Sequence, residues 1–554
     1  MLGLNINKFI KVVFDACISL QRNLRWSRKA SFHIRNELAL INGGFILSTT
    51  TPVIPTQTKV AIFGTASLAF CGILVETSMN VTFPTLMHQL HTTLATVQWV
   101  TTAYLLAVAA TMVITAFIQQ RFRWRTIINV GGAGFVLGGL LCTVAPQLWL
   151  LLFGRIIQAI GTGLALPLVF AQIMTLVPFT AQGRFTGTAG MLIALAPSLG
   201  PTYGGLVTQL LSWRLIFGIT LPFGLIAWLI TAKTIRQTQA PRSRPFPLCQ
   251  FGLVVAALIL LIFSVNNLST HGLSLVFVWL PLLLAVLAVL TFTRSATRTT
   301  HPLINLAVFQ QGDFTRALLI YFFIQFIQIG LTFLLPNFAQ LALGKNALVS
   351  GLMLLAGSLC SAILSPLAGK LMDRRGIRRP FQIGSGFLLL ATLSLAGLAQ
   401  HLSVGLIIGL FVGFQIGFSC LFNNALTYGL QQLPPQLMGD GNALFNTLQQ
   451  YSGSLGTAIM AVLITLGTRM APSASSTMQT TLGTQIALWF SLIIIMIVAA
   501  LALTTKPIAN MADDQHQSRS SNHWFTWDLV KPLKASLSFT SSLLLTTEFT
   551  VRYS

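Results

Sequence analysis

Long apolar segments separated by short polar ones dominate this chain. Between Val60 and Leu503, runs of roughly 20 apolar residues recur, which is the length that an α-helix needs to cross a lipid bilayer. The pattern predicts an all-α polytopic membrane protein with about 14 spanning helices. The predicted spans are residues 60–83, 96–118, 126–145, 148–172, 186–209, 214–232, 248–267, 274–293, 314–336, 349–368, 380–399, 404–428, 441–467 and 484–503.

The segments outside these spans are polar or basic. Residues 1–59 carry eight Lys and Arg side chains, and apolar residues from Ile6 to Cys17 recur at helical spacing. This fits either a short amphipathic helix on an anionic membrane surface or an unstructured arm, and the sequence does not choose between them. Residues 504–554 include an apolar stretch at 538–545 that is too short to span, so we expect a cytoplasmic tail.

The net charge of +23 first suggests a nucleic-acid partner. Its distribution argues against one, because the basic residues form short clusters between apolar runs. Cytoplasmic loops of membrane proteins are enriched in Lys and Arg, and placing both termini in the cytoplasm puts most basic residues there. The outer loops and helix ends then hold only Arg214, Lys345 and Arg469. The sequence therefore predicts cytoplasmic termini and no nucleic-acid binding.

Glu76 is the one acidic residue that this topology places deep in a span. The chain has ten acidic residues, and the other nine fall in the tails or at inner helix ends. A carboxylate in hydrocarbon is costly and usually marks a proton or ion pathway. Arg155, inside the fourth span, also needs a partner or a water-filled cavity. The alternative for the two residues is a structural buried ion pair that never titrates.

Enzymatic chemistry has no support in the sequence. The six cysteines form no Cys-x-x-Cys pair and lie mostly in apolar runs, which favours buried thiols over metal sites or disulfides. No nucleophile–base set, metal-ligand cluster or phosphate-binding Gly-x4-Gly-Lys-Ser/Thr motif stands out. We therefore expect no enzyme activity, no metal and no cofactor.

Several motifs together resemble the major facilitator superfamily, in its branch of fourteen-span drug:proton antiporters. The resemblance extends over about residues 60–503. The segment around Glu76 resembles the first-span signature of this branch, in which the acid is usually Asp, and Trp99 and Tyr104 fit the second span. The fourth-span motif is matched by Arg155, Gln158, Gly161 and Gly163, with Ala159 in place of a glycine. The fifth-span antiporter motif is matched by Gly200, Pro201, Gly204 and Gly205, with Ala196 in place of a glycine.

The inner-loop motif of the family is intact only in the second half. It comprises Gly369, Asp373, Arg374, Gly376, Arg378 and Arg379. In the first half, Gln120 replaces the acidic residue and Arg123 replaces a glycine. A cytoplasmic latch in which Asp373 pairs with basic residues is therefore expected in the second half only. The alternative is a plain solvated basic turn.

The resemblance implies a 6 + 2 + 6 arrangement of helices in two pseudo-symmetric halves, with alternating access to a site between them. The expected division is a basic arm at 1–59, a six-helix bundle at 60–232, two inserted helices with linkers at 233–313, a second six-helix bundle at 314–503 and a tail at 504–554. Glu76 and Arg155 would couple transport to protons. The fifth-span and inner-loop motif residues would act in gating.

Amide and aromatic side chains supply most of the expected substrate cavity. The candidates are Asn80, Gln158, Phe322, Gln325, Gln328, Asn423, Asn424, Asn446 and Gln449. With one carboxylate at depth, such a cavity suits lipophilic small molecules that are neutral or carry one positive charge. Each amide could instead act as an interhelical hydrogen-bonding group.

The function expected from these features is proton-coupled multidrug efflux by a monomer in the plasma membrane, driven by the proton gradient and of the kind that confers antibiotic resistance. Two alternatives stay open: a dedicated transporter of one metabolite, and a sensor or scaffold that moves nothing. The sequence does not give the substrate.

Overall fold

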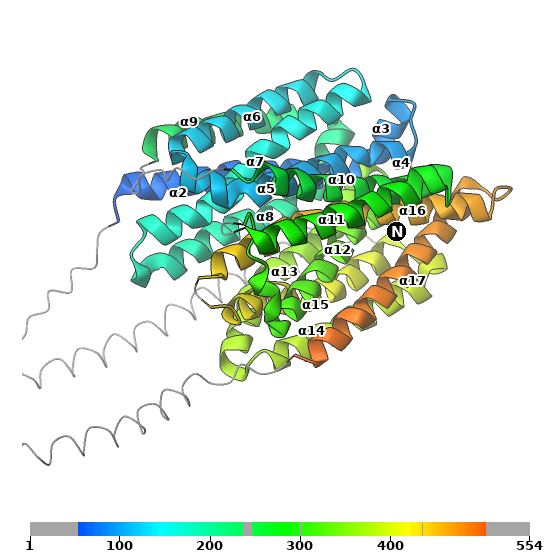
Figure 1. Ribbon diagram of the computed structural model, residues 1–554. Coiled ribbons are helices and arrows are strands. Elements are labelled where there is room, and N and C mark those ends of the chain that lie inside the picture. Colours follow the sequence, from blue (N-terminus) through cyan, green and yellow to red (C-terminus); the bar gives the residue numbers. More distant parts are fainter. Residues whose placement is uncertain (1–53, 236–245, 300–301, 435, 506–554) are drawn as a thin grey trace, which may run out of the picture. The chain divides into compact units, whose positions relative to one another are not determined.

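The structure, a computed structural model, describes residues 54–235, 246–299, 302–434 and 436–505. The predictions for the N-terminal arm before residue 54 and for the tail after residue 505 lie outside these residues. Within the described ranges every regular element is a helix (Figure 1). The expectation of an all-α fold is therefore confirmed.

The fourteen predicted spans are confirmed one for one, because the described part of the chain has 14 helices long and apolar enough to cross a membrane. The first bundle contains α2 (Thr56–Ser78, extended by the 3-10 turn η2, Met79–Val81), α5 (Trp99–Arg121, preceded by α4, Leu94–Val97), α6 (Trp124–Val144), α7 (Leu148–Leu176), α8 (Phe179–Leu210) and α9 (Arg214–Thr234). The inserted pair is α10 (Leu248–His271) and α11 (Leu280–Arg298, preceded by the π-helical turn η3, Leu275–Trp279). The second bundle contains α12 (Gly312–Leu341), α13 (Ala347–Arg375), α14 (Arg378–Gly397), α15 (Val404–Gln431), α16 (Met438–Met470) and α17 (Ser476–Leu503). Short helices α3 (Phe83–Gln89), η4 (Leu306–Gln310) and η5 (Ala399–His401) connect them.

Both ends of the helical region differ from the predicted boundaries. Helix α2 begins at Thr56, inside the segment expected to be an arm. Helix α17 begins at Ser476, whereas the predicted span begins at residue 484. The prediction left out the first two turns of the helix because they are polar and it rested on hydropathy alone. Those turns are held by packing: a Cβ atom on Gly483 would collide with the carbonyl oxygen of Ile464 in α16.

The two bundles repeat the same close helix contact. In the first, Gly161 of α7 lies against Gly131 and Phe135 of α6. In the second, Gly417 of α15 lies against Gly384 and Leu388 of α14. Small residues let helix backbones approach closely in membranes, where packing drives association. The equivalent contacts support the predicted pseudo-symmetry and relate α7 to α15.

We expect Gly384→Val to destabilise the second bundle. A side chain at Gly384 would collide with Leu421 and Cys420 of α15, and overpacking of a tight contact typically costs about 1–3 kcal/mol. Thermal unfolding of purified protein in detergent would measure this. Gly386→Val is the matched control, since a Cβ at this exposed position two residues away meets nothing within 4 Å. Equal loss of stability in the two variants would contradict the packing argument.

The two bundles are joined mainly through α8 with α13 and α5 with α16. We call the end of the bundle at Thr56 the inner end, following the predicted orientation. The hydrogen bonds between the bundles lie in the middle and the outer part. The Ser198 and Thr202 hydroxyls donate to backbone oxygens of α13, Thr102 pairs with Thr457, and Asn337 and Gln340 donate to the carbonyl oxygens of Asn80 and Val81.

Glycines in α8 and α13 show how far the contact between these two helices extends along their length. In the outer part, a Cβ on Gly351 would collide with the carbonyl oxygen of Pro201, and one on Gly205 with that of Ala347. In the inner part, a Cβ on Gly187, Gly190 or Gly369 would meet nothing within 4 Å. The two bundles are therefore in contact at their outer ends and separate toward their inner ends.

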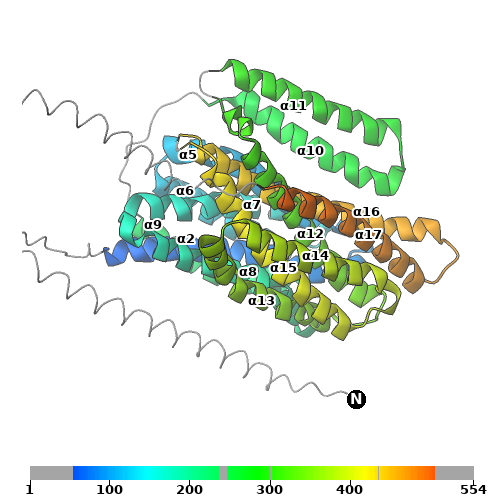
Figure 2. The same ribbon diagram turned by 90° about the horizontal axis from the view of Figure 1, so that it is seen from below.

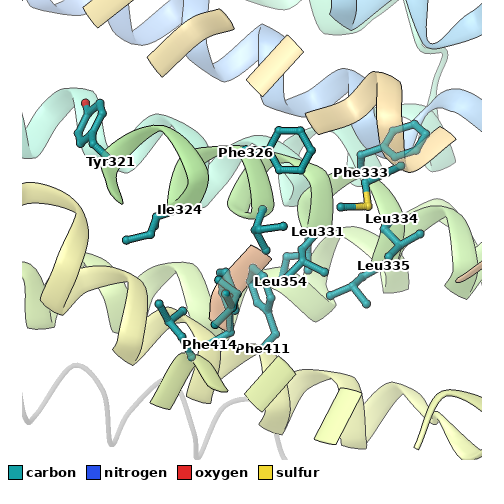
Figure 3. Packing of buried hydrophobic residues seen from close by; sticks show 14 of the residues in the cluster. Tyr321, Ile324, Phe326, Leu331, Phe333, Leu334, Leu335, Leu354, Phe411 and Phe414 are labelled. Carbon is teal, nitrogen blue, oxygen red and sulfur yellow. The ribbon is translucent and has the colours of Figure 1, made fainter. Parts of the chain in front are cut away.

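The inserted helices α10 and α11 run side by side along one side of the bundles, and α10 contacts α16 and α5 (Figure 2). The largest apolar core surrounds α12 in the second bundle and extends into the first bundle at Trp213 and Phe217. Figure 3 shows Ile324, Leu331 and Leu354 packed near Phe411 and Phe414.

Candidate functional site

Glu76 lies in the last turn of α2, toward the outer end of the bundle. Its side chain is 5% exposed. The carboxyl oxygen Oε2 is buried and has no hydrogen-bond partner. The same turn is anchored, because the Ser78 hydroxyl donates to the carbonyl oxygen of Gly200 in α8 at 2.9 Å. A fixed helix end therefore holds a carboxyl group that has no direct partner.

Arg155 of α7 is fully buried but well supported. Its Nε donates to the carbonyl oxygen of Val100 at 3.3 Å, and Nη1 donates to Oε1 of Gln158 at 3.0 Å. The guanidinium carbon lies 3.8 Å from the centre of the Tyr104 ring. A cation over an aromatic face is stabilised, more so when both are shielded from water. Nη2 remains without a partner.

Glu76 and Arg155 do not form a direct ion pair. Within the described part of the chain, the one salt bridge joins Arg316 to Asp313. The charges of Glu76 and Arg155 nevertheless act on each other electrostatically. Glu76 Oε2, Arg155 Nη2 and Gln158 Nε2 are all buried without partners. Unpaired buried polar groups are costly, so this region has spare capacity for a proton or water.

Tyr104 is the residue whose role the sequence did not reveal. Its hydroxyl lies 3.0 Å from the carbonyl oxygen of Gly72, to which it donates, and 2.7 Å from the hydroxyl of Thr162. These contacts fix the ring beneath Arg155. The sequence contained a signal, since a buried arginine needs support and Tyr104 is an aromatic residue in a neighbouring span.

Asn80 and Gln158, two predicted cavity residues, lie away from the other candidates. Asn80 is 1% exposed and its side chain accepts a hydrogen bond from the Thr101 hydroxyl. It belongs to the closed outer contact between η2 and α12. Gln158 is fully buried and supports Arg155. Among the described residues, no hydrogen bond joins either side chain to the candidate amides of the second bundle, although the backbone oxygen of Asn80 accepts from Asn337 of α12.

Three amides of the second bundle hold helices together. Asn424 is buried and donates to the carbonyl oxygen of Ala368 in α13. Asn423, one residue earlier, is exposed and donates to the Ser365 hydroxyl at 2.6 Å. Gln449 of α16 accepts from the Tyr321 hydroxyl of α12 at 2.8 Å. Asn446 instead donates to the carbonyl oxygen of Asn442 in its own helix.

Gln325 and Gln328 of α12 differ from these amides. Each is about nine-tenths buried, at 8% and 9% exposed. Oε1 of Gln328 is buried without a partner. The structure gives neither amide a hydrogen bond, although the two lie on one face of the helix. Among the described residues, they are therefore the buried candidate amides that keep hydrogen-bonding capacity.

A stack of aromatic rings was missed by the sequence analysis. The ring of Phe422 in α15 lies parallel to Tyr321, with centroids 4.2 Å apart, and Phe418 stacks on Phe422 at 4.7 Å. Phe418 and Phe422 are half-buried. Their spacing of four residues on one helix was the available signal. The predicted Phe322 packs elsewhere, in an apolar cluster with Leu261 of α10.

The two bundles are chemically unequal at equivalent positions. Six residues before Gly161 stands Arg155, whereas six residues before the equivalent Gly417 stands Phe411. Gln158 likewise corresponds to Phe414, and the rings of Phe411 and Phe414 are stacked 6.3 Å apart (Figure 3). The first bundle therefore holds the charges, and the second holds aromatic rings and amides.

Comparison with known proteins agrees with this architecture. The family model for the Major Facilitator Superfamily matches residues 65–457. The chain belongs to this superfamily. It is 31% identical over 407 residues to the lincomycin resistance protein LmrB of Bacillus subtilis, covering 72% of this chain and 84% of that protein. It is 28% identical to the multidrug resistance protein B homolog of Mycobacterium tuberculosis, covering 74% and 78%.

Two further similarities widen the comparison. The riboflavin transporter RibZ of Clostridioides difficile is 24% identical, covering 71% of this chain and 85% of that protein. Among solved structures, the POT family transporter PepTSo matches with a TM-score of 0.58 at 16% identity, covering 82% of this chain and all of that one. The latter similarity supports the fold alone. The relatives place this major facilitator chain in the multidrug-efflux branch.

The fifth-span motif of this major facilitator chain forms two different contacts. A Cβ on Gly200 or Gly204 would collide with Thr77 or Ser78 of α2, so these glycines allow close packing within the first bundle. Pro201 and Gly205 instead lie against Gly351 and Ala347 of α13. The motif therefore holds α8 against both neighbours at the outer end.

The inner-loop motif is not engaged in this structure. Gly376 ends α13 with a positive φ of 72°, a conformation that favours glycine and sets the turn into α14. Asp373, Arg374 and Arg378 are exposed, and among the described residues Asp373 has no salt bridge. The ion pair that the predicted latch requires is therefore absent among the described residues, and the exposed side chains fit a solvated basic turn in this structure.

Proposed function

We propose that this chain is a proton-coupled antiporter that exports lipophilic small molecules, neutral or singly cationic, by alternating access. The observation that carries the proposal is the buried carboxyl group of Glu76, whose Oε2 has no hydrogen-bond partner and no salt bridge among the described residues, although the charge of Arg155 acts on it. A carboxyl group removed from water resists ionisation unless a positive charge compensates. Such a group can gain or lose a proton as its surroundings change.

Arg155 serves the coupling by stabilising the deprotonated state. Because its own contacts are with Tyr104, Val100 and Gln158, it stays in place whichever form Glu76 takes. Glu76 is protonated from the outer side as substrate leaves. It loses the proton toward the inner side as substrate binds. One carboxylate at depth suits an exchange of few protons, without a relay of several acids.

Substrate binds on the second bundle, on the face that carries Phe418, Phe422 and the amides of α12. Adaptable apolar walls with few polar anchors are the general pattern of small-molecule sites. The unpaired amides of Gln325 and Gln328 can form hydrogen bonds with a substrate without first losing protein partners. Half-buried rings offer apolar contact and, to a cation, their π faces.

Transport in reconstituted vesicles tests the proposal. The vesicles should hold the protein with its inner ends facing the lumen, in an acidic external medium. They should then export cationic dyes and lincomycin from the lumen, and a protonophore should stop this export. Release of protons from the purified protein on substrate addition should accompany binding. Transport that ignores the pH gradient would refute proton coupling.

A dedicated transporter of one metabolite is the second candidate, since a relative is named a riboflavin transporter. A substrate panel separates the two candidates. A multidrug exporter should move several unrelated lipophilic cations and neutral drugs. A dedicated carrier should move one metabolite and no dye.

We expect Gln325→Ala to weaken substrate binding with little effect on stability. Among the described residues the amide has no hydrogen-bond partner to lose, and one hydrogen bond contributes about 0.5–1.5 kcal/mol, so the Kd should rise roughly 2- to 13-fold. Asn424→Ala should do the opposite, because it removes an interhelical bond worth about 0.6 kcal/mol without touching substrate. Dye-binding titrations and thermal unfolding of both variants would check this. A Kd unchanged in Gln325→Ala would move the binding site elsewhere.

The remaining expectations complete the proposal. The chain would act as a monomer in the plasma membrane, with both termini in the cytoplasm, and would need no bound cofactor or metal because the proton gradient supplies the energy. Basic residues at the inner helix ends, such as Arg125, Arg294 and Arg379, support this orientation.

A further inference from the structure

The inserted helix α10 lies over the line where α5 of the first bundle meets α16 of the second. Near the outer end, the side-chain amide of Gln98, at the start of α5, donates to Oδ1 of Asn266 in α10. Both side chains are at least nine-tenths buried. This bond ties the insert to the first bundle.

The contact with the second bundle is broader. The Tyr451 hydroxyl of α16 donates to the carbonyl oxygen of Leu258 in α10 at 3.3 Å. Ile262 of α10 packs in one apolar cluster with Tyr451 and with Leu106 of α5. Helix α10 packs more extensively on α16 than on α5.

The insert is also fastened to the segment that leads into the second bundle. Oε1 of Gln250 in α10 accepts from the backbone N–H of Leu303 at 2.8 Å, and Nε2 donates to Ser295 and Thr299 at the end of α11. The segment continues into η4, which packs on α12. A movement of the second bundle would therefore carry α10 with it.

We propose that α10 is a latch on the outer contact between the bundles. Helix α10 moves with α16, and the hydrogen bond that Gln98 donates to Asn266 breaks whenever the outer ends of α5 and α16 separate. The latch therefore favours the state that is closed outside and separated inside, in which substrate would load. This inference goes beyond the proposed function, because it requires only that the two bundles separate.

The test measures the outer opening directly. Spin labels at Leu211 and Lys345, exposed residues at the outer ends of α8 and α13, report the distance across the contact in nanodiscs, in protein whose native cysteines are replaced. Asn266→Leu should raise the ratio of open to closed outer ends about threefold, the effect expected from one average interhelical hydrogen bond. Gln98→Leu should do the same from the other side. The double variant should shift the ratio no further than either single one.

Two control variants separate a latch from general loosening. Ser264→Ala removes a bond from α10 to the carbonyl oxygen of Val278, inside the inserted pair, and should leave the ratio unchanged. Tyr451→Phe removes the hydrogen bond between α16 and α10, which is present whether the outer ends are open or closed. This variant should therefore also leave the ratio of open to closed outer ends unchanged. Unchanged distances in both Asn266→Leu and Gln98→Leu would overturn the proposal. The proposal would also be overturned if Ser264→Ala shifted the ratio of open to closed outer ends as much as Asn266→Leu, or if Tyr451→Phe shifted it more.

Discussion

Glu76→Gln should abolish coupling to the pH gradient while leaving the fold intact. Glutamine has nearly the same size as glutamate but cannot exchange a proton, and in the structure the carboxyl Oε2 has no hydrogen bond to lose. If one proton drives each substrate, a gradient of one pH unit, about 1.4 kcal/mol, sustains a substrate ratio of roughly tenfold. In the variant this ratio should fall to one. The measurement is steady-state dye accumulation in vesicles with the membrane potential clamped.

Matched variants make this result specific. Glu76→Asp keeps a carboxyl group and should hold the same substrate ratio. The variant should reach this ratio more slowly, because the shorter side chain changes the distance to Arg155. Asp440→Asn removes an acid at the inner end of α16 and should leave the ratio unchanged. A full tenfold ratio in Glu76→Gln would place the proton site elsewhere.

The helices of this chain were predictable because lipid imposes a strict length and composition on every span. The exceptions have local causes. The first turns of α17 are polar and were left out, although Gly483 packs them against α16. The burial of Glu76 and Arg155 within spans was also predictable, because both lie inside long apolar runs.

The partners of these residues were not predictable. A direct ion pair of Glu76 with Arg155 was the alternative that the sequence left open, and the described residues contain no such pair. Tyr104 supports the guanidinium instead, in a way that depends on how α5 and α7 are rotated. The amides show the same limit. Asn423 and Asn424 are adjacent in sequence and both donate to α13, yet the first is exposed and the second is buried. Hydropathy fixes where a span lies, and packing decides which way each side chain points.

The conformational state of the molecule was equally hidden from the sequence. The fifth-span motif suggested gating in general terms, whereas the structure shows that its outer residues lie directly on α13. Contact at Gly205 and Gly351 coincides with free space at Gly190 and Gly369. A rigid rocking of the two bundles would separate α8 from α13 at the outer end and bring them into contact at the inner end. The outer glycine contact is therefore a place where one substitution can favour one state over the other.

Gly351→Val should prevent the outer ends from closing and thereby block export. The new side chain would collide with the carbonyl oxygen of Pro201 only when α8 and α13 are in contact. A cost of about 1–3 kcal/mol for overpacking changes the ratio of closed to open outer ends by roughly 5- to 160-fold. The labels at Leu211 and Lys345 should show the longer distance, and uptake of substrate from the inner side should fall with it. Gly386→Val, on an exposed face of α14, should change neither. An unchanged distance in Gly351→Val would mean that α8 and α13 accommodate the side chain without separating, and that this contact does not control the outer gate.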